Sequence, residues 1–231
     1  MRIAAWVLAL ALTGAGTVHA QAGYLDQEAL TRELRSLTNG SPLATLRSLG
    51  RSTEGRDIWL VEIGRRSGAA LDTRPGLLVV GNLEGDHLAG SALAVEAIRY
   101  LLSAAGQAAA ADVLANNVIY VVPRLNPDGA QAMFARVRTG QRTNARPVDD
   151  DNDGRIDEDP GEDLNGDGMI TLMRVPDPAG DYLVDAGDAR LMRRADRSKG
   201  EAGAFRVYRE GRDTDHDGFY NEDGPGGVDL N

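Results

Sequence analysis

The chain contains 231 residues and no cysteine, so disulfide bonds and cysteine-based metal sites are excluded. A chain of this length can bury the core of one sizeable domain. Its formal net charge of −10 argues against nucleic-acid binding, which needs a basic surface. The acidic residues gather at 149–167 and 213–223, whereas Lys199 is the only lysine beside many arginines.

The first twenty residues have the features of a secretory signal peptide. Arg2 gives a positive start, an apolar run covers 3–16, and Val18 and Ala20 place small residues at the positions that precede a cleavage site. The run is too short to span a bilayer as a mature anchor. We therefore expect cleavage after Ala20, a secreted or periplasmic protein, and no membrane association afterwards. The alternative is a retained N-terminal membrane anchor.

The stretch from 24 to 123 alternates between helical and strand patterns. Its first helix is indicated by leucines at helical spacing, and its last strands are short, fully apolar runs of the kind buried on both faces of a sheet. The expected elements are a helix over 24–37, strands over 44–49 and 58–63 joined by a turn at 53–55, a strand over 76–81, a helix over 87–103 and a strand over 117–123. Because a strand, a helix and a strand follow one another, we expect a right-handed crossover in an α/β fold.

After residue 144 the composition changes to aspartate, glycine, asparagine and proline until about residue 227. Such a stretch has too few apolar residues to form a core, so we expect it to be disordered without a ligand. It contains an internal repeat, with related hexapeptides at 149–154, 163–168 and 213–218. Each hexapeptide has oxygen-bearing side chains at positions 1, 3 and 5 and glycine at position 6, the spacing that folds a loop around Ca2+.

These repeats predict a structural calcium-binding insert. Position 12 lacks the glutamate of a complete helix-loop-helix calcium site in all three repeats, so short aspartate-rich loops are expected instead. The expected calcium ligands are Asp149, Asp151, Asp153, Asp157, Asp163, Asn165, Asp167, Asp213, Asp215 and Asp217. The alternative is a set of solvated acidic loops without a metal.

Four segments, in the same chain order, resemble motifs of the zinc carboxypeptidases of the A/B type. They are the Gly-Arg-Ser-Thr-Glu-Gly-Arg-Asp-Ile run at 50–58, the Gly-Asn-Leu-Glu-Gly-Asp-His-Leu-Ala-Gly run at 81–90, Asn-Pro-Asp-Gly at 126–129 and Gly-Val-Asp-Leu-Asn at 227–231. The resemblance covers roughly residues 45–145 and the last five, and the acidic insert lies outside it. It implies a zinc ion that polarises the scissile carbonyl of a peptide and activates a water molecule.

The resemblance also assigns roles to four residues. Glu84 and His87 stand where the family has a His-x-x-Glu zinc pair, with the two residue types exchanged. Arg142 falls near the position of the arginine that stabilises the oxyanion, with Arg138 and Arg146 as competitors. Asn231 matches the asparagine that helps to hold the carboxylate at the substrate's C-terminus. The family's third zinc ligand and its general-base glutamate have no match in this sequence.

The expected fold is therefore α/β, a partial mixed twisted sheet flanked by helices, with an irregular calcium-binding insert rich in aspartate and glycine. The expected division is a signal peptide at 1–20, the first part of a carboxypeptidase-like catalytic domain at 21–145, the insert at 146–226 and the start of the next catalytic segment at 227–231. Since 227–231 ends inside a motif, we expect a fragment that is poorly stable and inactive alone, with exposed apolar sheet edges.

The sequence thus predicts a secreted hydrolase that uses zinc and structural Ca2+ to release C-terminal amino acids from peptides or proteins. One alternative is a related zinc amidohydrolase that acts on an N-acyl amino acid. A second is a non-catalytic, calcium-ordered protein that binds peptides or surfaces, which the exchange of glutamate and histidine favours. The sequence assigns neither the preferred C-terminal residue nor an oligomeric state.

Overall fold

A computed structural model describes residues 23–149, 152, 154–157, 159–214, 216, 218–221, 224 and 227–231. The predicted signal peptide and four of the predicted calcium ligands, Asp151, Asp153, Asp215 and Asp217, lie outside these residues. In the part of the chain that the structure describes, no helix has both the length and the apolar character required to cross a bilayer.

The first helix, α1 (Gln27–Thr38), forms for the reasons that its sequence indicates. The side chain of Asp26 accepts a hydrogen bond from the backbone N–H of Ala29 at 2.7 Å and so caps the helix. Leu30 and Leu34, four residues apart, are fully buried against the sheet. The helix predicted over 24–37 is confirmed with a start three residues later.

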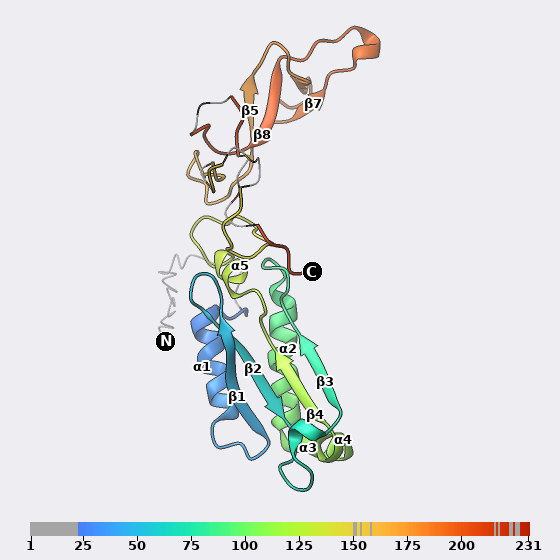
Figure 1. Cartoon of the computed structure of the whole chain (residues 1–231). Coiled ribbons are helices and arrows are strands. Elements are labelled where there is room, and N and C mark those ends of the chain that lie inside the picture. The colour runs from blue at the N-terminus through green and yellow to red at the C-terminus, as the bar shows by residue number, and fades with distance from the viewer. Residues whose placement is uncertain are drawn as a thin grey trace, which may run out of the picture.

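The main sheet has the strand order β1-β2-β4-β3 and is mixed (Figure 1). Its strands are β1 (Ala44–Arg51), β2 (Asp57–Ile63), β3 (Gly76–Val80) and β4 (Val118–Val122). The pairs β1–β2 and β2–β4 are antiparallel, whereas β3 and β4 are parallel, with Leu78 opposite Tyr120. The predicted hairpin and the predicted crossover are therefore both confirmed.

The crossover helix α2 (Leu88–Leu102) and α1 pack side by side on one face of this sheet, where Val95 and Ile98 meet Val61 and Val121. Three short helices that the sequence did not indicate follow α2, namely α3 (Ala104–Ala109), α4 (Ala111–Asn116) and α5 (Pro127–Ala132). A 3-10 turn at Leu71–Thr73 precedes β3. The edge strand β3 exposes Leu77 and Leu78, so apolar side chains remain uncovered at this edge of the sheet.

The insert contains a second sheet, which contradicts the expected disorder. Its strands, in the order β5-β8-β6-β7, are β5 (Leu172–Pro176), β6 (Tyr182–Val184), β7 (Met192–Arg194) and β8 (Phe205–Arg209), with a 3-10 turn at Arg197–Lys199. Arg174 stacks on Phe205 and Arg194 on Tyr182, each guanidinium carbon 5.5 Å from the ring centroid. Arginine side chains stacked on aromatic rings here supply contacts that the composition of the insert did not predict.

The three predicted calcium loops share two backbone features at the positions that the structure describes. In each loop the carboxylate at position 1 accepts a hydrogen bond from the glycine N–H at position 6, at 3.1 Å from Gly154, 2.9 Å from Gly168 and 3.0 Å from Gly218. Position 4 is left-handed in all three, with φ of 68° at Asn152, 77° at Gly166 and 70° at His216. The sequence repeat is therefore matched by a structural repeat at positions 1, 4 and 6.

The second and the third loop are each held by a buried carboxylate that lies outside the loop itself, Glu210 and Asp159 respectively. Glu210 accepts hydrogen bonds from the backbone of Leu164, Asn165 and Thr171 and from the Thr171 hydroxyl. These bonds lower the pKa of Glu210, and the bond from the Thr171 backbone has the largest effect. Asp159 serves the loop at 213–221 in the same manner, through the backbone of Thr214 and Asn221. Both carboxylates are satisfied within the insert.

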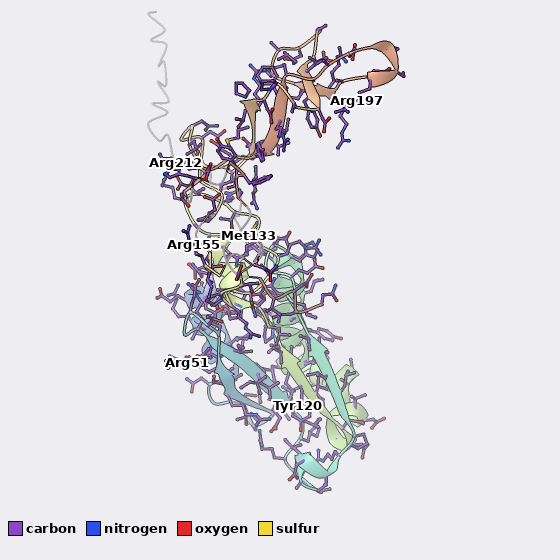
Figure 2. The ribbon with its side chains drawn as sticks, turned by 45° about the horizontal axis from the view of Figure 1, so that its top comes forward. Arg51, Tyr120, Met133, Arg155, Arg197 and Arg212 are labelled. Atoms are coloured by element: carbon purple, nitrogen blue, oxygen red, sulfur yellow. The ribbon has the colours of Figure 1, made fainter. Side chains whose placement is uncertain are left out.

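The insert leaves and rejoins the α/β part at adjacent points. The N–H of Gly227 donates to the carbonyl of Arg146 at 3.1 Å, and the N–H of Asn144 donates to the carbonyl of Val228 at 3.0 Å. Figure 2 shows Met133 and Arg155 at this junction and Arg197 near the far end of the insert. The insert therefore projects from the end of the sheet that carries α5 and residue 231.

Candidate active site

Asp128 joins two of the motifs that suggested the family. Its side chain, 1% exposed, accepts hydrogen bonds from the Ser52 hydroxyl at 2.7 Å, from the Glu54 backbone at 3.2 Å and from Arg56 Nη1 at 2.7 Å. The turn between β1 and β2 is thereby fixed to the start of α5. These three donors satisfy the buried carboxylate.

Asn126 fixes the segment that carries Arg142. The Asn126 side chain accepts from the Gly129 N–H at 3.0 Å and donates through Nδ2 to the carbonyls of Arg142, at 2.9 Å, and Thr143, at 3.0 Å. Asn126 is 1% exposed, so the loss of its three bonds would leave buried polar groups unpaired. The Asn-Pro-Asp-Gly turn is therefore a scaffold for residues 142–143.

The loop after β3 is shaped by Asn82 and Gly85. Asn82 has a left-handed φ of 53°, and its Nδ2 donates to the Glu84 carbonyl at 2.6 Å. Gly85 donates to the Arg142 carbonyl at 2.8 Å and lies so close to Gly129 that an added Cβ would be 2.5 Å from that residue's carbonyl carbon. The loop that carries Glu84 thus packs directly against the Asn-Pro-Asp-Gly turn.

Glu84 lies at the centre of the four residues to which the resemblance assigned roles. Its Oε1 accepts from Arg142 Nη2 at 2.6 Å and from Asn231 Nδ2 at 3.2 Å. Its Oε2 lies 2.6 Å from His87 Nδ1, although this contact lacks hydrogen-bond geometry. The hydrogen bond to Glu84 raises the pKa of Arg142 above its ordinary value. Residues from three distant parts of the sequence therefore converge on one carboxylate.

The donors around Glu84 suit a divalent cation. One ligand atom each from Glu84, Asp86 and His87 lie within 4.8 Å of one another. Glu84 Oε2 and Asp86 Oδ1 are both buried and accept no hydrogen bond, as expected of oxygens whose lone pairs await a cation. Carboxylate oxygen and imidazole nitrogen are both zinc ligands. Asp86 was absent from the predicted site. Its acidic side chain, two residues after Glu84 and directly before His87, is the sequence feature that could have identified it as a metal ligand.

The competing arginines lie elsewhere. The Arg138 backbone donates to Gly168 in the insert at 3.3 Å, and the Arg146 carbonyl accepts from Gly227. Among these three arginines, only Arg142 forms an ion pair with Glu84. The predicted calcium ligands that the structure describes lie in the insert, and His216 lies in the third of its loops. Glu84, His87, Arg142 and Asn231 are thus brought together, and the predicted calcium residues form a separate group.

Comparison with known proteins identifies the family. The model of the zinc carboxypeptidase family, Peptidase_M14, matches residues 30–167. Similar proteins include carboxypeptidase SOL1 of Arabidopsis thaliana, 28% identical over 129 residues, and human carboxypeptidase D, 34% identical over 98 residues. These alignments cover 55% and 42% of this chain but only 25% and 7% of the relatives. The chain therefore spans a quarter or less of their length.

Solved structures of carboxypeptidases resemble part of the chain. A carboxypeptidase A from Helicoverpa armigera gives a TM-score of 0.47 at 21% identity and covers 53% of this chain and 29% of its own. A metallo-carboxypeptidase from Burkholderia cenocepacia gives a TM-score of 0.45 at 22% identity and covers 53% and 31%. On the match of the family model to more than half of its residues, this chain belongs to the zinc carboxypeptidase family.

Proposed function

We propose that this chain is part of a secreted or periplasmic zinc carboxypeptidase that releases C-terminal amino acids from peptides. The observation that carries the proposal is the convergence of His87, Arg142 and Asn231 on the buried carboxylate of Glu84. Family membership supports the reaction class, and the apolar run at 3–16 supports export.

Glu84 and His87 would hold the zinc ion, with Asp86 beside them. When bound there, zinc would polarise the scissile carbonyl and lower the pKa of a water molecule. Arg142, whose side chain is 55% exposed, can donate to an oxyanion from the open side of the site. Asn231 can donate through its amide to the substrate's terminal carboxylate. Because both residues donate to Glu84 Oε1 in the structure, substrate and Glu84 compete for the same donors.

The first test is metal binding by the purified chain. Titration of metal-free protein with Zn2+ in a calorimeter should show one binding site. Glu84→Gln and His87→Ala should each lower the Zn2+ affinity by more than roughly 100-fold, because loss of a residue that only supports a metal ligand already lowers metal affinity by about 10–100-fold. Glu28→Gln, on the exposed face of α1, is the matched control and should bind as the parent does. Equal affinity in all variants would place the zinc ion elsewhere.

Activity separates the alternatives and requires the complete protein. A carboxypeptidase should trim a peptide with a free C-terminus and leave its C-terminally amidated form intact, because the amide removes the carboxylate. Hydrolysis of N-acyl amino acids alone would indicate the amidohydrolase. Zinc-free peptide binding without hydrolysis would indicate the non-catalytic protein.

We further propose that the three loops of the insert bind structural Ca2+. The shared left-handed position 4 and the shared bond from glycine N–H to the first aspartate support this. Loops of this kind in extracellular modules bind with Kd values of about 10⁻⁴–10⁻³ M. Millimolar Ca2+, but not Mg2+, should therefore strengthen the near-ultraviolet circular dichroism of Tyr208 and Tyr220, whose rings lie 4.9 Å apart beside the third loop. An identical response to both ions would contradict a calcium site.

A further inference from the structure

Arg124 is a buried cation outside the candidate active site. It follows β4 directly after Pro123 and is 3% exposed. Its Nη2 donates to the Leu25 carbonyl at 2.6 Å and its Nη1 to Gln27 Oε1 at 3.4 Å, but its buried Nε has no hydrogen-bond partner. None of the ion pairs formed among the described residues includes Arg124.

This arrangement leaves a positive charge without a counter-charge. A buried ion is costly unless an opposite charge and hydrogen bonds replace its hydration. Burial lowers the pKa of Arg124 to about 10, and the more distant Asp26 offsets only part of this effect. Two neutral carbonyl acceptors satisfy the outer nitrogens, so the charge itself and Nε remain uncompensated.

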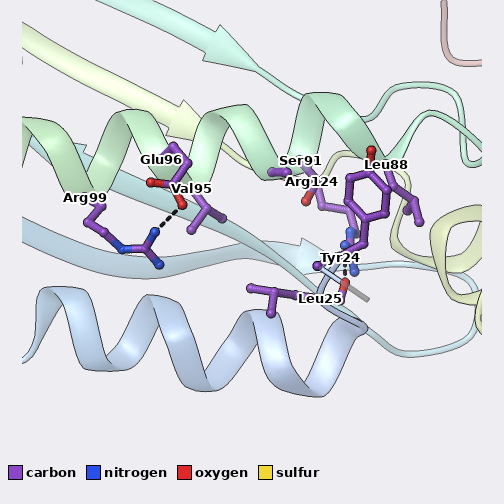
Figure 3. A pocket seen from close by; sticks show the side chains of 10 residues that line it. Tyr24, Leu25, Leu88, Ser91, Val95, Glu96, Arg99 and Arg124 are labelled. Atoms are coloured by element: carbon purple, nitrogen blue, oxygen red, sulfur yellow. Dashed lines mark hydrogen bonds and ion pairs between the residues drawn. The ribbon is translucent and has the colours of Figure 1, made fainter. Parts of the chain in front are cut away.

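A cavity of about 110 Å3 lies next to Arg124, between the start of α1 and helix α2 (Figure 3). Arg124, Ser91 and Tyr24 lie together at one end of it, and Glu96 and Arg99 pair with each other at the other end. The buried side chains of Leu88 and Val95 add an apolar wall. The cavity thus combines one uncompensated cation with a small apolar surface.

We propose that this cavity binds a short-chain monocarboxylate, with the carboxylate against Arg124 and the alkyl group against Leu88 and Val95. The volume equals that of about three to four water molecules at roughly 30 Å3 each, which suits an acetate-sized anion. It is far below the 300–1,000 Å3 that sites for larger ligands usually need. A carboxylate oxygen can accept a charge-assisted hydrogen bond from the second Nη2 hydrogen, whereas the Nε has almost no solvent-accessible surface.

The test is saturation-transfer NMR on the purified chain, with sodium acetate as the probe and ionic strength held constant with sodium chloride. The acetate methyl signal should receive saturation from the parent protein and from Arg47→Gln, which removes an exposed arginine of β1. Arg124→Gln should weaken acetate binding at least tenfold. Equal saturation in Arg124→Gln, or none with the parent protein, would overturn the proposal.

A second variant covers the case in which Arg124→Gln fails to fold. Ser91→Leu keeps the cation and fills the cavity from α2, so it should fold and lose the acetate signal. Undiminished acetate binding by Ser91→Leu would refute the site. Competition with inorganic phosphate is the last measurement. Phosphate lacks an alkyl group, so displacement of acetate by equimolar phosphate would also refute a monocarboxylate site. None of these measurements depends on zinc binding at Glu84.

Discussion

Replacing Asp128 by alanine is expected to lower the free energy of unfolding by about 3–5 kcal/mol, the usual cost of removing one partner from a buried ion pair. The Asp128 carboxylate is 1% exposed and accepts from Ser52, Glu54 and Arg56. Its removal leaves the Ser52 hydroxyl and the Glu54 N–H without this acceptor at the junction of the hairpin and α5, and it leaves Arg56 paired with Glu54 alone. A loss of this size is a large share of the 5–15 kcal/mol typical of a folded domain.

Urea denaturation followed by the fluorescence of Trp59 would measure the change, since Trp59 lies on β2 against α1. Asp57→Ala is the matched control. Asp57 lies at the end of the same hairpin, but its side chain is 31% exposed and its ion pair with Arg51 spans 3.7 Å. We expect that control to cost less than about 1 kcal/mol. Similar losses in both variants would show that the buried junction does not stabilise the fold.

The α/β part could be predicted from the sequence because its patterns are strong and local. Leu30 and Leu34 face the core at helical spacing, and the apolar runs of β3 and β4 fit a parallel pair. The short helices after α2 escaped prediction because six-residue alanine-rich segments carry too little periodicity. Their existence depends on packing, of α3 against α2 and of α4 against β4, rather than on their own sequence.

The sheet of the insert was missed for a different reason. Composition over the whole insert obscured two short alternating segments, of which 205–209 reads Phe-Arg-Val-Tyr-Arg. Arginine counts as polar in such a pattern, yet Arg174 covers an aromatic ring with its guanidinium plane. A charged residue therefore contributed the packing that a hydrophobic residue was expected to supply.

For the candidate site, the resemblance named the residues but could not supply their arrangement. Glu84 and Arg142 are 58 positions apart, and their contact depends on Asn126, which holds the carbonyls of Arg142 and Thr143. A buried asparagine acting through backbone carbonyls leaves no periodic signal in the sequence. The exchange of glutamate and histidine also kept Asp86 out of the predicted site. Its place there follows from the structure, in which one ligand atom each of Glu84, Asp86 and His87 lie within 4.8 Å of one another.

Gly85→Ala is expected to cost about 1–3 kcal/mol of stability and, in addition, to weaken Zn2+ binding by roughly 10–100-fold, although it removes no donor atom. The new Cβ would lie 2.5 Å from the carbonyl oxygen of Gln141 and 2.6 Å from the Cα of Gly129. Both neighbours are backbone, so the loop must move away from the Asn-Pro-Asp-Gly turn. That movement would separate Glu84 from Arg142, since Gly85 donates to the Arg142 carbonyl. Calorimetric Zn2+ titration and urea denaturation of the same samples measure the two effects.

Gly224→Ala is the matched control, because a Cβ at Gly224 would meet no atom within 4 Å and should change neither quantity. Comparison with Glu84→Gln then distinguishes position from chemistry. Glu84→Gln keeps the backbone contact of the loop and removes a carboxylate charge, so it should weaken Zn2+ binding by more than roughly 100-fold with a smaller loss of stability. Gly85→Ala keeps every donor and displaces them. Full Zn2+ affinity in Gly85→Ala would mean that the position of the metal ligands does not depend on the contact of Gly85 with the backbone of Gly129 and Gln141.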